Sequence, residues 1–238
     1  MSYRNITMAN LCIIPARGGS KRIPRKNIKD FLGKPIIAYS IETALSSNLF
    51  DEVMVSTDDD EIADIAIELG AKVPFFRSTK NADDYSTTLD VIKEVILAYK
   101  GIGKDFDNGC CIYPTAPLVD INDLELGYRK MLEEGRSSVF PLVAFSYPVW
   151  RGFENVDDGA VKMIWPEYKS SRSQDLKKVY HDAGQWYWFK INDLIKREQL
   201  FGDNTGGIEL SELKVQDIDT QIDWKLAELK YEILQGIK

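Results

Sequence analysis

The feature that most constrains the fold is a regular alternation of short apolar segments with longer amphipathic ones through the first half of the chain. Short apolar runs have the length of buried strands, whereas apolar residues spaced three and four apart predict helices. The strand candidates are 11–14, 52–56, 73–76 and 110–113, and the helix candidates are 37–45, 62–69, 89–99 and 124–132. Strands and helices that alternate with short links predict an α/β layered fold with a mostly parallel sheet. In such folds the ligand site lies beyond the carboxyl ends of the strands.

The rhythm changes after Ser137, where strand candidates follow one another without helices between them. These candidates are 138–145, 161–165 and 185–189, separated by stretches that contain Pro, Gly and Asp. We interpret the chain as a single domain, 1–238, in which approximately 138–190 contains a small β-rich insert. This range holds four of the five tryptophans, namely Trp150, Trp165, Trp186 and Trp188. An aromatic-rich protruding surface is typical of an interface, so we expect the insert to contact another chain.

A basic, glycine-containing segment follows the first strand candidate and is the strongest functional signal. Between Arg17 and Lys34, seven lysines and arginines stand against one acid, Asp30, in a chain whose formal net charge is -7. The pair Gly18 and Gly19 lets the main chain approach an anion, and its N–H groups can cup phosphate oxygens. Lysine and arginine add point charges and forked donors. The segment therefore predicts a site for the phosphates of a nucleotide triphosphate, with a solvated basic loop as the alternative.

Several classes of function lose support from the same sequence. Neither G-x-x-x-x-G-K-[ST] nor G-x-G-x-x-G occurs, which argues against kinase-like and dinucleotide-binding sites. The acidic balance outside the basic segment argues against a nucleic-acid partner. No apolar run reaches the roughly 18 residues of a membrane span, and residues 1–7 lack the apolar core of a secretory signal. We therefore expect no membrane partner and a cytoplasmic location, with Cys12, Cys110 and Cys111 as reduced, buried thiols.

Two aspartates near the end of the sequence have the spacing of a metal site. Asp217 and Asp219 are separated by one residue, so in an extended segment both carboxylates project to one face. Mg²⁺ binds one or two carboxylates together with waters and substrate phosphates, and this pair predicts such a site. The alternative is an acidic pair at the end of a loop. Asp223 differs, because with Thr220 it forms a capping-box pattern ahead of an apolar stripe.

Several ordered motifs together resemble the CMP-sialic acid synthetase family, the cytidylyltransferases that activate nonulosonic acids with CTP. The matching segments are 14–39, 76–78, 113–118, 173–176 and 216–220. Within the family, residues 180–188 resemble the branch that acts on pseudaminic acid. The resemblance implies a three-layer Rossmann-like fold of the nucleotide-diphospho-sugar transferase type, with a mostly parallel mixed sheet and a β-rich dimerisation insert. It also implies a homodimer, with CTP and a nonulosonic acid as substrates and Mg²⁺ as cofactor.

The resemblance further assigns roles to single residues. The positions matching triphosphate contacts with a catalytic role are Arg17, Lys21 and Lys26. The positions matching nucleotide contacts are Ala16, Gly18, Gly19, Ser20, Asn27, Arg77 and Ser86. The positions matching sugar contacts are Tyr113, Arg172, Gln174, Asp175 and His181, and the metal positions are Asp217 and Asp219.

Some of these positions keep a second interpretation. Arg22 and Arg25 are equally consistent with phosphate contacts and with a solvated face. Ser86 or Thr87 could instead cap the helix that follows them. His181, the single histidine, has the chemistry of a general base, but a structural or substrate hydrogen bond is the better interpretation. Lys177 replaces the proline that the family carries after Asp-Leu, which leaves the path of that loop open.

The predicted reaction is the Mg²⁺-dependent transfer of CMP from CTP to a nonulosonic acid, with release of pyrophosphate. Tyr113 stands where sialic acid enzymes of the family carry Gln. An aromatic wall suits the deoxy carbon of pseudaminic acid, so we rank that sugar first. Legionaminic or N-acetylneuraminic acid follows, and then 3-deoxy-octulosonate. A guanylyltransferase that shares the fold is a second enzyme hypothesis, and a non-catalytic nucleotide-binding sensor is the alternative from another class.

Overall fold

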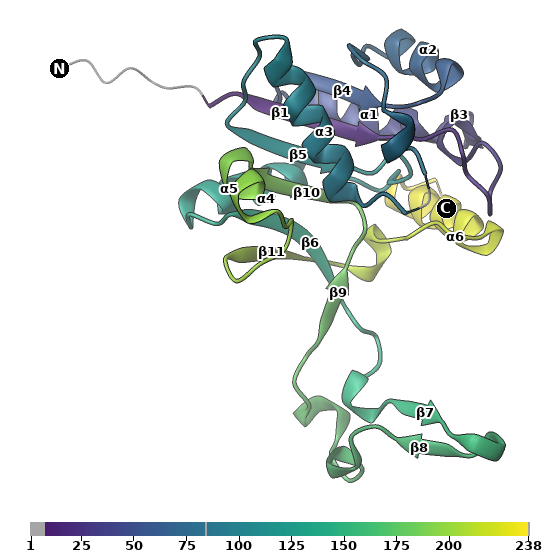
Figure 1. Ribbon diagram of the computed structural model, residues 1–238. Helices are drawn as coiled ribbons and strands as arrows, with labels where there is room; N and C mark the ends of the chain where they lie inside the picture. Colours follow the sequence, from purple (N-terminus) through teal and green to yellow (C-terminus); the bar gives the residue numbers. More distant parts are fainter. Residues whose placement is uncertain (1–7, 84, 238) are drawn as a thin grey trace.

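A mixed β-sheet runs through the body of the molecule (Figure 1). The computed structural model describes residues 8–83 and 85–237, and within these ranges seven strands form the sheet in the order β11-β6-β10-β5-β1-β4, with β9 paired to β6. The strands are β1 (Asn10–Pro15), β4 (Glu52–Ser56), β5 (Asn108–Ile112), β6 (Ser138–Ala144), β9 (Tyr180–Asp182), β10 (Trp186–Lys190) and β11 (Thr205–Leu210).

The pairing confirms a mostly parallel mixed sheet. β1 pairs in parallel with β4 and β5, and β11 pairs in parallel with β6. β10 runs antiparallel between β5 and β6, and β9 adds an antiparallel pair to β6. The carboxyl ends of β1, β4 and β5 therefore meet at one edge, where α/β folds place their ligands.

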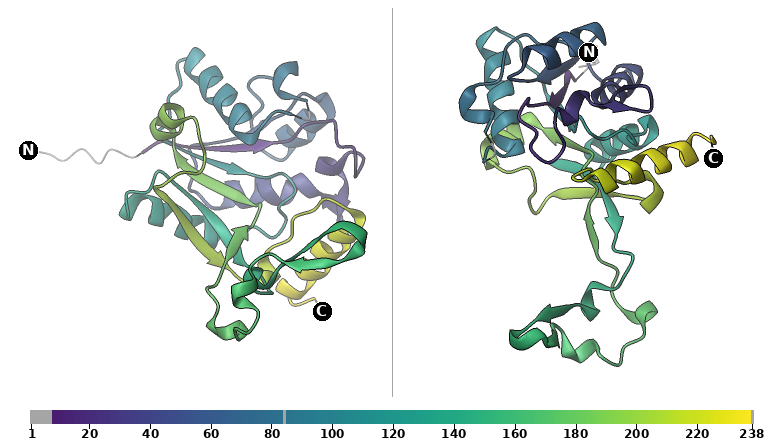
Figure 2. Two further views of the ribbon diagram at one scale, coloured as in Figure 1. Left: turned by 60° about the horizontal axis from the view of Figure 1, so that its bottom comes forward. Right: turned by 90° about the vertical axis from the view of Figure 1, so that its right-hand side faces the viewer.

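Helices cover both faces of the sheet, which gives three layers (Figures 1 and 2). Residues of β1 alternate between the faces: Cys12 and Ile14 pack in the core with α1, α2 and α4, whereas Leu11 and Ile13 pack with α3 and α5. The helices are α1 (Ile36–Ser46), α2 (Asp60–Glu68), α3 (Thr88–Gly101), α4 (Ile121–Glu133), α5 (Ile191–Arg197) and α6 (Gln221–Leu234).

The last helix, α6, packs against the segment that follows β1. Trp224 and Ala227 of α6 form a separate buried cluster with Ile23 and Phe31. Phe31 belongs to a small ribbon made of β2 (Asp30–Phe31) and β3 (Lys34–Pro35). Apolar packing thus holds segments 23–39 and 218–231 together beside the edge where the carboxyl ends of β1, β4 and β5 meet.

The helix boundaries agree with the local signals in the sequence. Thr87 caps α3 in a capping box with Asp90, which confirms the capping interpretation, and Gly70 follows α2 with φ +91°. One predicted strand is wrong: no strand forms over the described segment 73–76, because the chain pairs with β4 only at Lys72. Pro74 then has no N–H to continue a ladder.

An arm extends from the body between β6 and β9 (Figures 1 and 2). It carries a hairpin of β7 (Phe153–Asn155) and β8 (Val161–Met163). It also carries short 3-10 turns, η3 (Val149–Arg151), η4 (Asp157–Gly159), η5 (Pro166–Tyr168) and η6 (Ser173–Asp175). The other 3-10 turns are η1 (Lys26–Ile28), η2 (Thr79–Asn81) and η7 (Glu212–Lys214).

The arm is narrower than the predicted insert. Its flanking strand candidates are β6 and β10, which belong to the central sheet because their apolar faces are buried there. Trp186 and Trp188 are therefore core residues with no exposed surface, a correction to their placement in a protruding insert. Trp150 and Trp165 do lie on the arm, and their rings meet edge to face at 5.5 Å.

Two further expectations concern thiols and membranes. Cys12, Cys110 and Cys111 are buried and free, which confirms the prediction, and burial raises the pKa of each. No helix in the described ranges has the length and apolar character needed to cross a membrane.

Candidate active site

The basic loop leaves the carboxyl end of β1 and turns beside β4. The N–H of Ala16 donates to the carbonyl of Ser56 at 2.9 Å, so the loop begins as a continuation of the sheet. The N–H of Ser20 then donates to the carbonyl of Gly18 at 3.0 Å, which closes a tight turn. The loop therefore holds its glycines and cations at the ends of two parallel strands.

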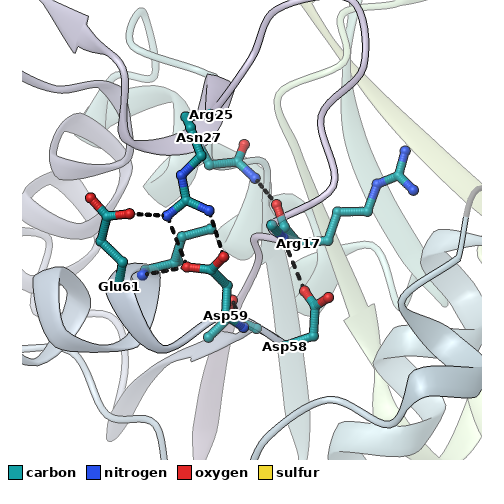
Figure 3. Close-up of polar contacts among 9 residues, drawn as sticks. Arg17, Arg25, Asn27, Asp58, Asp59 and Glu61 are labelled. Carbon is teal, nitrogen blue, oxygen red and sulfur yellow. Dashed lines mark hydrogen bonds and ion pairs between the residues drawn. The ribbon is translucent and has the colours of Figure 1, made fainter.

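Two aspartates that follow β4 hold this loop in place (Figure 3). The N–H of Gly18 donates to Asp58 Oδ1 at 2.9 Å. A Cβ at Gly18 would lie 2.6 Å from Asp59 Oδ2, so this position has no room for a side chain. The Asp58 carboxylate accepts the hydrogen bond of the Gly18 N–H, which we expected to donate to phosphate. The close packing against Asp59 is a second reason for glycine at this position.

Arg25 is a structural residue of the loop. Its backbone is left-handed (φ 54°), and its guanidinium binds both oxygens of Asp59, at 2.5 and 2.9 Å, and also binds Glu61 (Figure 3). Asp59 also caps α2 by accepting from the N–H of Ile62 at 3.1 Å. The Arg25 hydrogen bond holds the pKa of Asp59 below its usual value. Neither a phosphate contact nor a solvated face describes this role, because Arg25 is an anchor that joins the loop to α2.

Asn27 holds the main chain of the loop from inside. It is buried, and its Nδ2 donates to the carbonyl of Arg17 at 2.9 Å. The guanidinium of Arg17 points away from the Arg25 cluster (Figure 3). The amide predicted to lie near the base and ribose therefore fixes the backbone from which Arg17 projects.

The basic loop and the aspartate pair meet in space. Lys26 Nζ donates to the carbonyl of Ile218 at 2.7 Å and lies 3.9 Å from Asp219 Oδ1. Arg22 pairs with Asp219 Oδ2 at 2.8 Å. Burial lowers the pKa of Lys26, and the charge of Asp219 partly opposes that shift. Cations and carboxylates from distant parts of the chain thus face one another across the site.

Asp217 and Asp219 have the chemistry of a magnesium site. Ile218 between them is buried in the α6 cluster, so both neighbouring side chains are directed outward. Although Asp217 is exposed, partial desolvation by its surroundings and the charge of Asp219 raise its pKa, an effect that a bound divalent cation would relieve. No further His, Cys, Asp or Glu among the described residues completes a set of three or more ligands, and Mg²⁺ needs none beyond such a pair.

Asp223 has the capping role that its sequence pattern predicted. It forms a capping box with Thr220 at the start of α6, and its Oδ2 also accepts from the N–H of Asp219 at 3.1 Å. The cap of α6 therefore holds the backbone of the metal candidate.

Three of the predicted nucleotide and sugar positions surround the same edge of the sheet. Arg77 is buried and donates to the carbonyl of Ser56 at 2.6 Å, and burial lowers its pKa. Tyr113 directly follows β5, and its hydroxyl lies 3.0 Å from Thr88 Oγ1. Ser86 bonds Asp83 Oδ1 at 2.8 Å within its own loop, ahead of the Thr87 cap.

The remaining sugar candidates are not brought to the basic loop within one chain. Arg172, Gln174 and Asp175 lie on the arm at or next to η6, where Arg172 Nε donates to Asp175 Oδ2 at 2.7 Å. His181 lies on β9 beside the base of the arm, with its ring 4.8 Å from that of Phe145. Its Nδ1 is 2.9 Å from the carbonyl of Asp182.

Sequence reasoning missed Asp58 and Asp59, which hold the loop, and Tyr187, whose ring packs against that of Tyr113 at 5.3 Å. The first pair carried a usable signal, because two carboxylates directly follow a strand candidate whose carboxyl end adjoins that of the first strand. Tyr187 lies in a continuous aromatic run, where nothing in the sequence separates its hydroxyl from the core.

The chain is similar to several known proteins. The family model described as Cytidylyltransferase matches residues 11–201. A pseudaminic acid cytidylyltransferase of Campylobacter jejuni is 43% identical over 95% of this chain and 97% of its own length. A CMP-N,N'-diacetyllegionaminic acid synthase of Legionella pneumophila is 31% identical over 96% of this chain and 98% of its own. Among solved structures, a CMP:2-keto-3-deoxy-manno-octonic acid synthetase complexed with CTP has a TM-score of 0.69 at 19% identity, covering 96% of this chain and 99% of that one, which confirms the fold.

Proposed function

The chain belongs to the cytidylyltransferase family, and from this premise we propose that it transfers CMP from CTP to a nonulosonic acid, with pseudaminic acid as the preferred substrate. The observation that carries the proposal is the meeting of Lys26 with Ile218 and Asp219, which joins a phosphate-binding loop to a metal-binding pair. Similarity to the Campylobacter enzyme along nearly the whole chain supports the choice of sugar.

The reaction requires a sugar hydroxyl to attack the α-phosphorus of CTP. A new P–O bond forms to the sugar oxygen, whose proton passes to solvent. The bond between the α-phosphorus and the bridging oxygen breaks, and pyrophosphate leaves with that oxygen. Most of the catalysis is positioning and neutralisation of charge. Arg17, Lys21 and Lys26 hold the triphosphate, while Asn27 and Asp58 keep the loop backbone in place.

Asp217 and Asp219 would hold Mg²⁺, which polarises the phosphate oxygens when bound. Arg22 and Lys26 lie against Asp219. The two cations therefore compensate the charge of the carboxylates and lie within reach of phosphate groups bound beside them.

We further propose a cytoplasmic homodimer that completes the sugar subsite. Arg172, Gln174 and Asp175 lie on an arm that projects from the body (Figure 1). Arg172 has the forked guanidinium that binds a sugar carboxylate. A second copy whose arm crosses the site would deliver these side chains to the basic loop of its partner.

The test is an assay of the purified chain with CTP, Mg²⁺ and a panel of pseudaminic, legionaminic, N-acetylneuraminic and 3-deoxy-octulosonic acids. We expect pyrophosphate and a CMP-sugar, with the highest kcat/KM for pseudaminic acid, and loss of turnover in Lys21→Ala. A clear preference for another sugar would overturn the choice of substrate. Binding of CTP without pyrophosphate release for any sugar would favour the sensor alternative.

A further inference from the structure

Ser56, the last residue of β4, holds the side chain of Arg77 at two points. Ser56 is buried, and its hydroxyl accepts a hydrogen bond from Arg77 Nε at 3.1 Å. Its carbonyl accepts a second bond from Arg77 Nη2 at 2.6 Å. The N–H of Arg77 also donates to the carbonyl of Thr57 at 2.8 Å. The end of β4 therefore fixes both the backbone and the side chain of a predicted nucleotide contact.

The two bonds to Ser56 set the direction of the whole guanidinium. This group is planar, and Nε and Nη2 lie on one edge of it, so a partner that engages both atoms fixes the plane. The remaining nitrogen, Nη1, carries two N–H groups. Among the residues that the structure describes, none accepts a hydrogen bond from it. The held arginine therefore keeps one end of its fork available as a donor.

Arg77 also lacks a paired carboxylate. Its side chain is 8% exposed, and no Asp or Glu in the described ranges forms an ion pair with it. Burial lowers its pKa, and the charges of Asp58 and Glu94 only partly oppose that shift. A buried charge without a partner destabilises a fold, and buried donors normally find acceptors. We therefore expect a ligand to supply the remaining acceptors.

Donor groups of this kind discriminate between the pyrimidine bases. A guanidinium donates hydrogen bonds and accepts none. On cytosine the carbonyl oxygen O2 and the ring atom N3 both accept, whereas N3 of uracil carries a hydrogen and opposes another donor. A guanidinium fixed against this edge of the base therefore favours cytosine over uracil, and one that can turn away favours it less.

We propose that Ser56 is a positioning residue that aims Arg77 at the acceptor edge of the nucleobase and so contributes to the selection of CTP over UTP. The inference rests on the proposed function, since it deepens the account of the same nucleotide site. The carbonyl of Ser56 also accepts from the N–H of Ala16 at 2.9 Å, where the basic loop begins. Removal of the hydroxyl alone therefore tests the hold on Arg77 and leaves the backbone bond to the loop in place.

The test is calorimetric binding of CTP and of UTP, each with Mg²⁺, to the wild type and to Ser56→Ala. We expect Ser56→Ala to weaken CTP binding about tenfold, the effect of one lost hydrogen bond to a charged group. UTP binding should weaken less than about twofold, because uracil gains less from the fixed donor. The preference for CTP, measured as the ratio of the two Kd values, should therefore fall.

Ser138→Ala is the matched control. Ser138 is also a buried serine at the end of a strand, and its hydroxyl lies 2.9 Å from Thr205 Oγ1. Neither of these residues is assigned to the site. The preference of Ser138→Ala for CTP should match that of the wild type, and a loss equal to that of Ser56→Ala would overturn the proposal.

Arg77→Gln, alone and combined with Ser56→Ala, shows whether the serine acts through the arginine. The double variant should have the same preference for CTP as Arg77→Gln alone. A further fall in the double variant would overturn the proposal, as would an unchanged preference in Ser56→Ala. If Ser56→Ala does not fold, Ser56→Cys makes the same comparison, because a thiol is a weaker acceptor at the same place.

Turnover separates this inference from the proposed function. Absence of pyrophosphate release from CTP with every nonulosonate would overturn the proposed function, while the binding ratios still decide the role of Ser56. Normal CMP-sugar synthesis together with an unchanged preference in Ser56→Ala would overturn the positioning role alone.

Discussion

Asp217 carries a charge that the ligand-free fold does not favour. Partial desolvation and the charge of Asp219 raise its pKa, so its contribution to stability is full at low pH and is lost as pH rises through the folded pKa. We expect Asp217→Asn to raise the Tm of the metal-free protein slightly at neutral pH, by less than the roughly 2–4 °C that 1 kcal/mol produces in a domain of this size, because the side chain is exposed and water screens its charge. The same change should abolish Mg²⁺-dependent turnover.

Asp223→Asn is the matched control for that prediction, because the pKa of Asp223 shifts the opposite way. Hydrogen bonds from Thr220 lower it, so this carboxylate stabilises the fold above its unfolded pKa, and the contribution is lost as pH falls through the folded pKa. Thermal melts at neutral pH should show a lower Tm for Asp223→Asn. A lower Tm for Asp217→Asn as well would contradict the assignment of Asp217 as an unfavourable charge.

Lys26 is expected to set the alkaline limit of activity. Burial lowers its pKa, and it must be protonated to hold phosphate, so kcat/KM for CTP should fall as pH rises through that lowered pKa. Lys26→Arg keeps the charge at any working pH. We expect a lower rate at neutral pH, because a forked guanidinium fits the ammonium position poorly, and an alkaline limb moved to higher pH in the pH–rate profile.

Lys29→Arg is the control for the alkaline limb, since Lys29 bonds the side chain of Gln221 at 2.9 Å and belongs to none of the predicted contacts. Its profile should match that of the wild type. An unmoved limb in Lys26→Arg would assign the titration to another group.

For single residues, the sequence predicted which residue types form the site better than it predicted which residues they contact. The cations, glycines and paired aspartates were visible as a pattern, and the structure gathers Arg22, Lys26 and Asp219. The sequence could not separate Arg25, which holds α2, from its neighbours, because its partner Asp59 lies 34 residues away along the chain. Nor could it show that the Gly18 amide would meet Asp58.

Between elements, the close approach of α4 to β10 depends on one glycine. A Cβ at Gly127 would lie 2.4 Å from the indole of Trp186, which is fully buried. We expect Gly127→Ala to destabilise the protein by about 1–3 kcal/mol, the usual effect of overpacking, despite the higher helix propensity of Ala. Chemical denaturation measures the change.

Gly101 provides the matched comparison in another helix. It is the last residue of α3, and a Cβ there meets nothing within 4 Å. Gly101→Ala should be neutral or stabilising by up to about 1 kcal/mol. Equal effects of the two substitutions would show that propensity rather than packing decides the outcome at Gly127.

The elements themselves were predictable where periodicity was unambiguous. The alternating half of the chain yields β1, β4, β5 and α1 to α4 close to their predicted positions. The strand predicted over 73–76 is wrong because a short apolar run predicts a strand whether or not a neighbouring strand is free to pair with it. β6 and β10 were recognised as strands but placed in the insert, since sheet membership depends on long-range pairing that a local pattern does not carry.

At the scale of the whole molecule, the arm is separable from the body. Its two stems leave side by side, with the N–H of Phe145 donating to the carbonyl of Val179 at 3.0 Å, and the described core clusters contain no residue between these two. Replacing 146–178 with a short Gly-Ser turn should give a folded body with a cooperative melt. Because we place both the dimer contact and Arg172 on the arm, the product should be monomeric by light scattering and inactive in CMP-sugar synthesis. A dimer that survives the deletion would move the interface to the body.

The contact between Lys26 and Ile218 spans 192 residues of sequence. Contacts of such long separation form late, because the chain between them must first be ordered. During refolding from denaturant, circular dichroism should therefore recover before the ability to release pyrophosphate, and partly folded chains should leave CTP unspent. The long sequence separation between the two halves of the site would thus keep the enzyme inactive until the chain has folded completely.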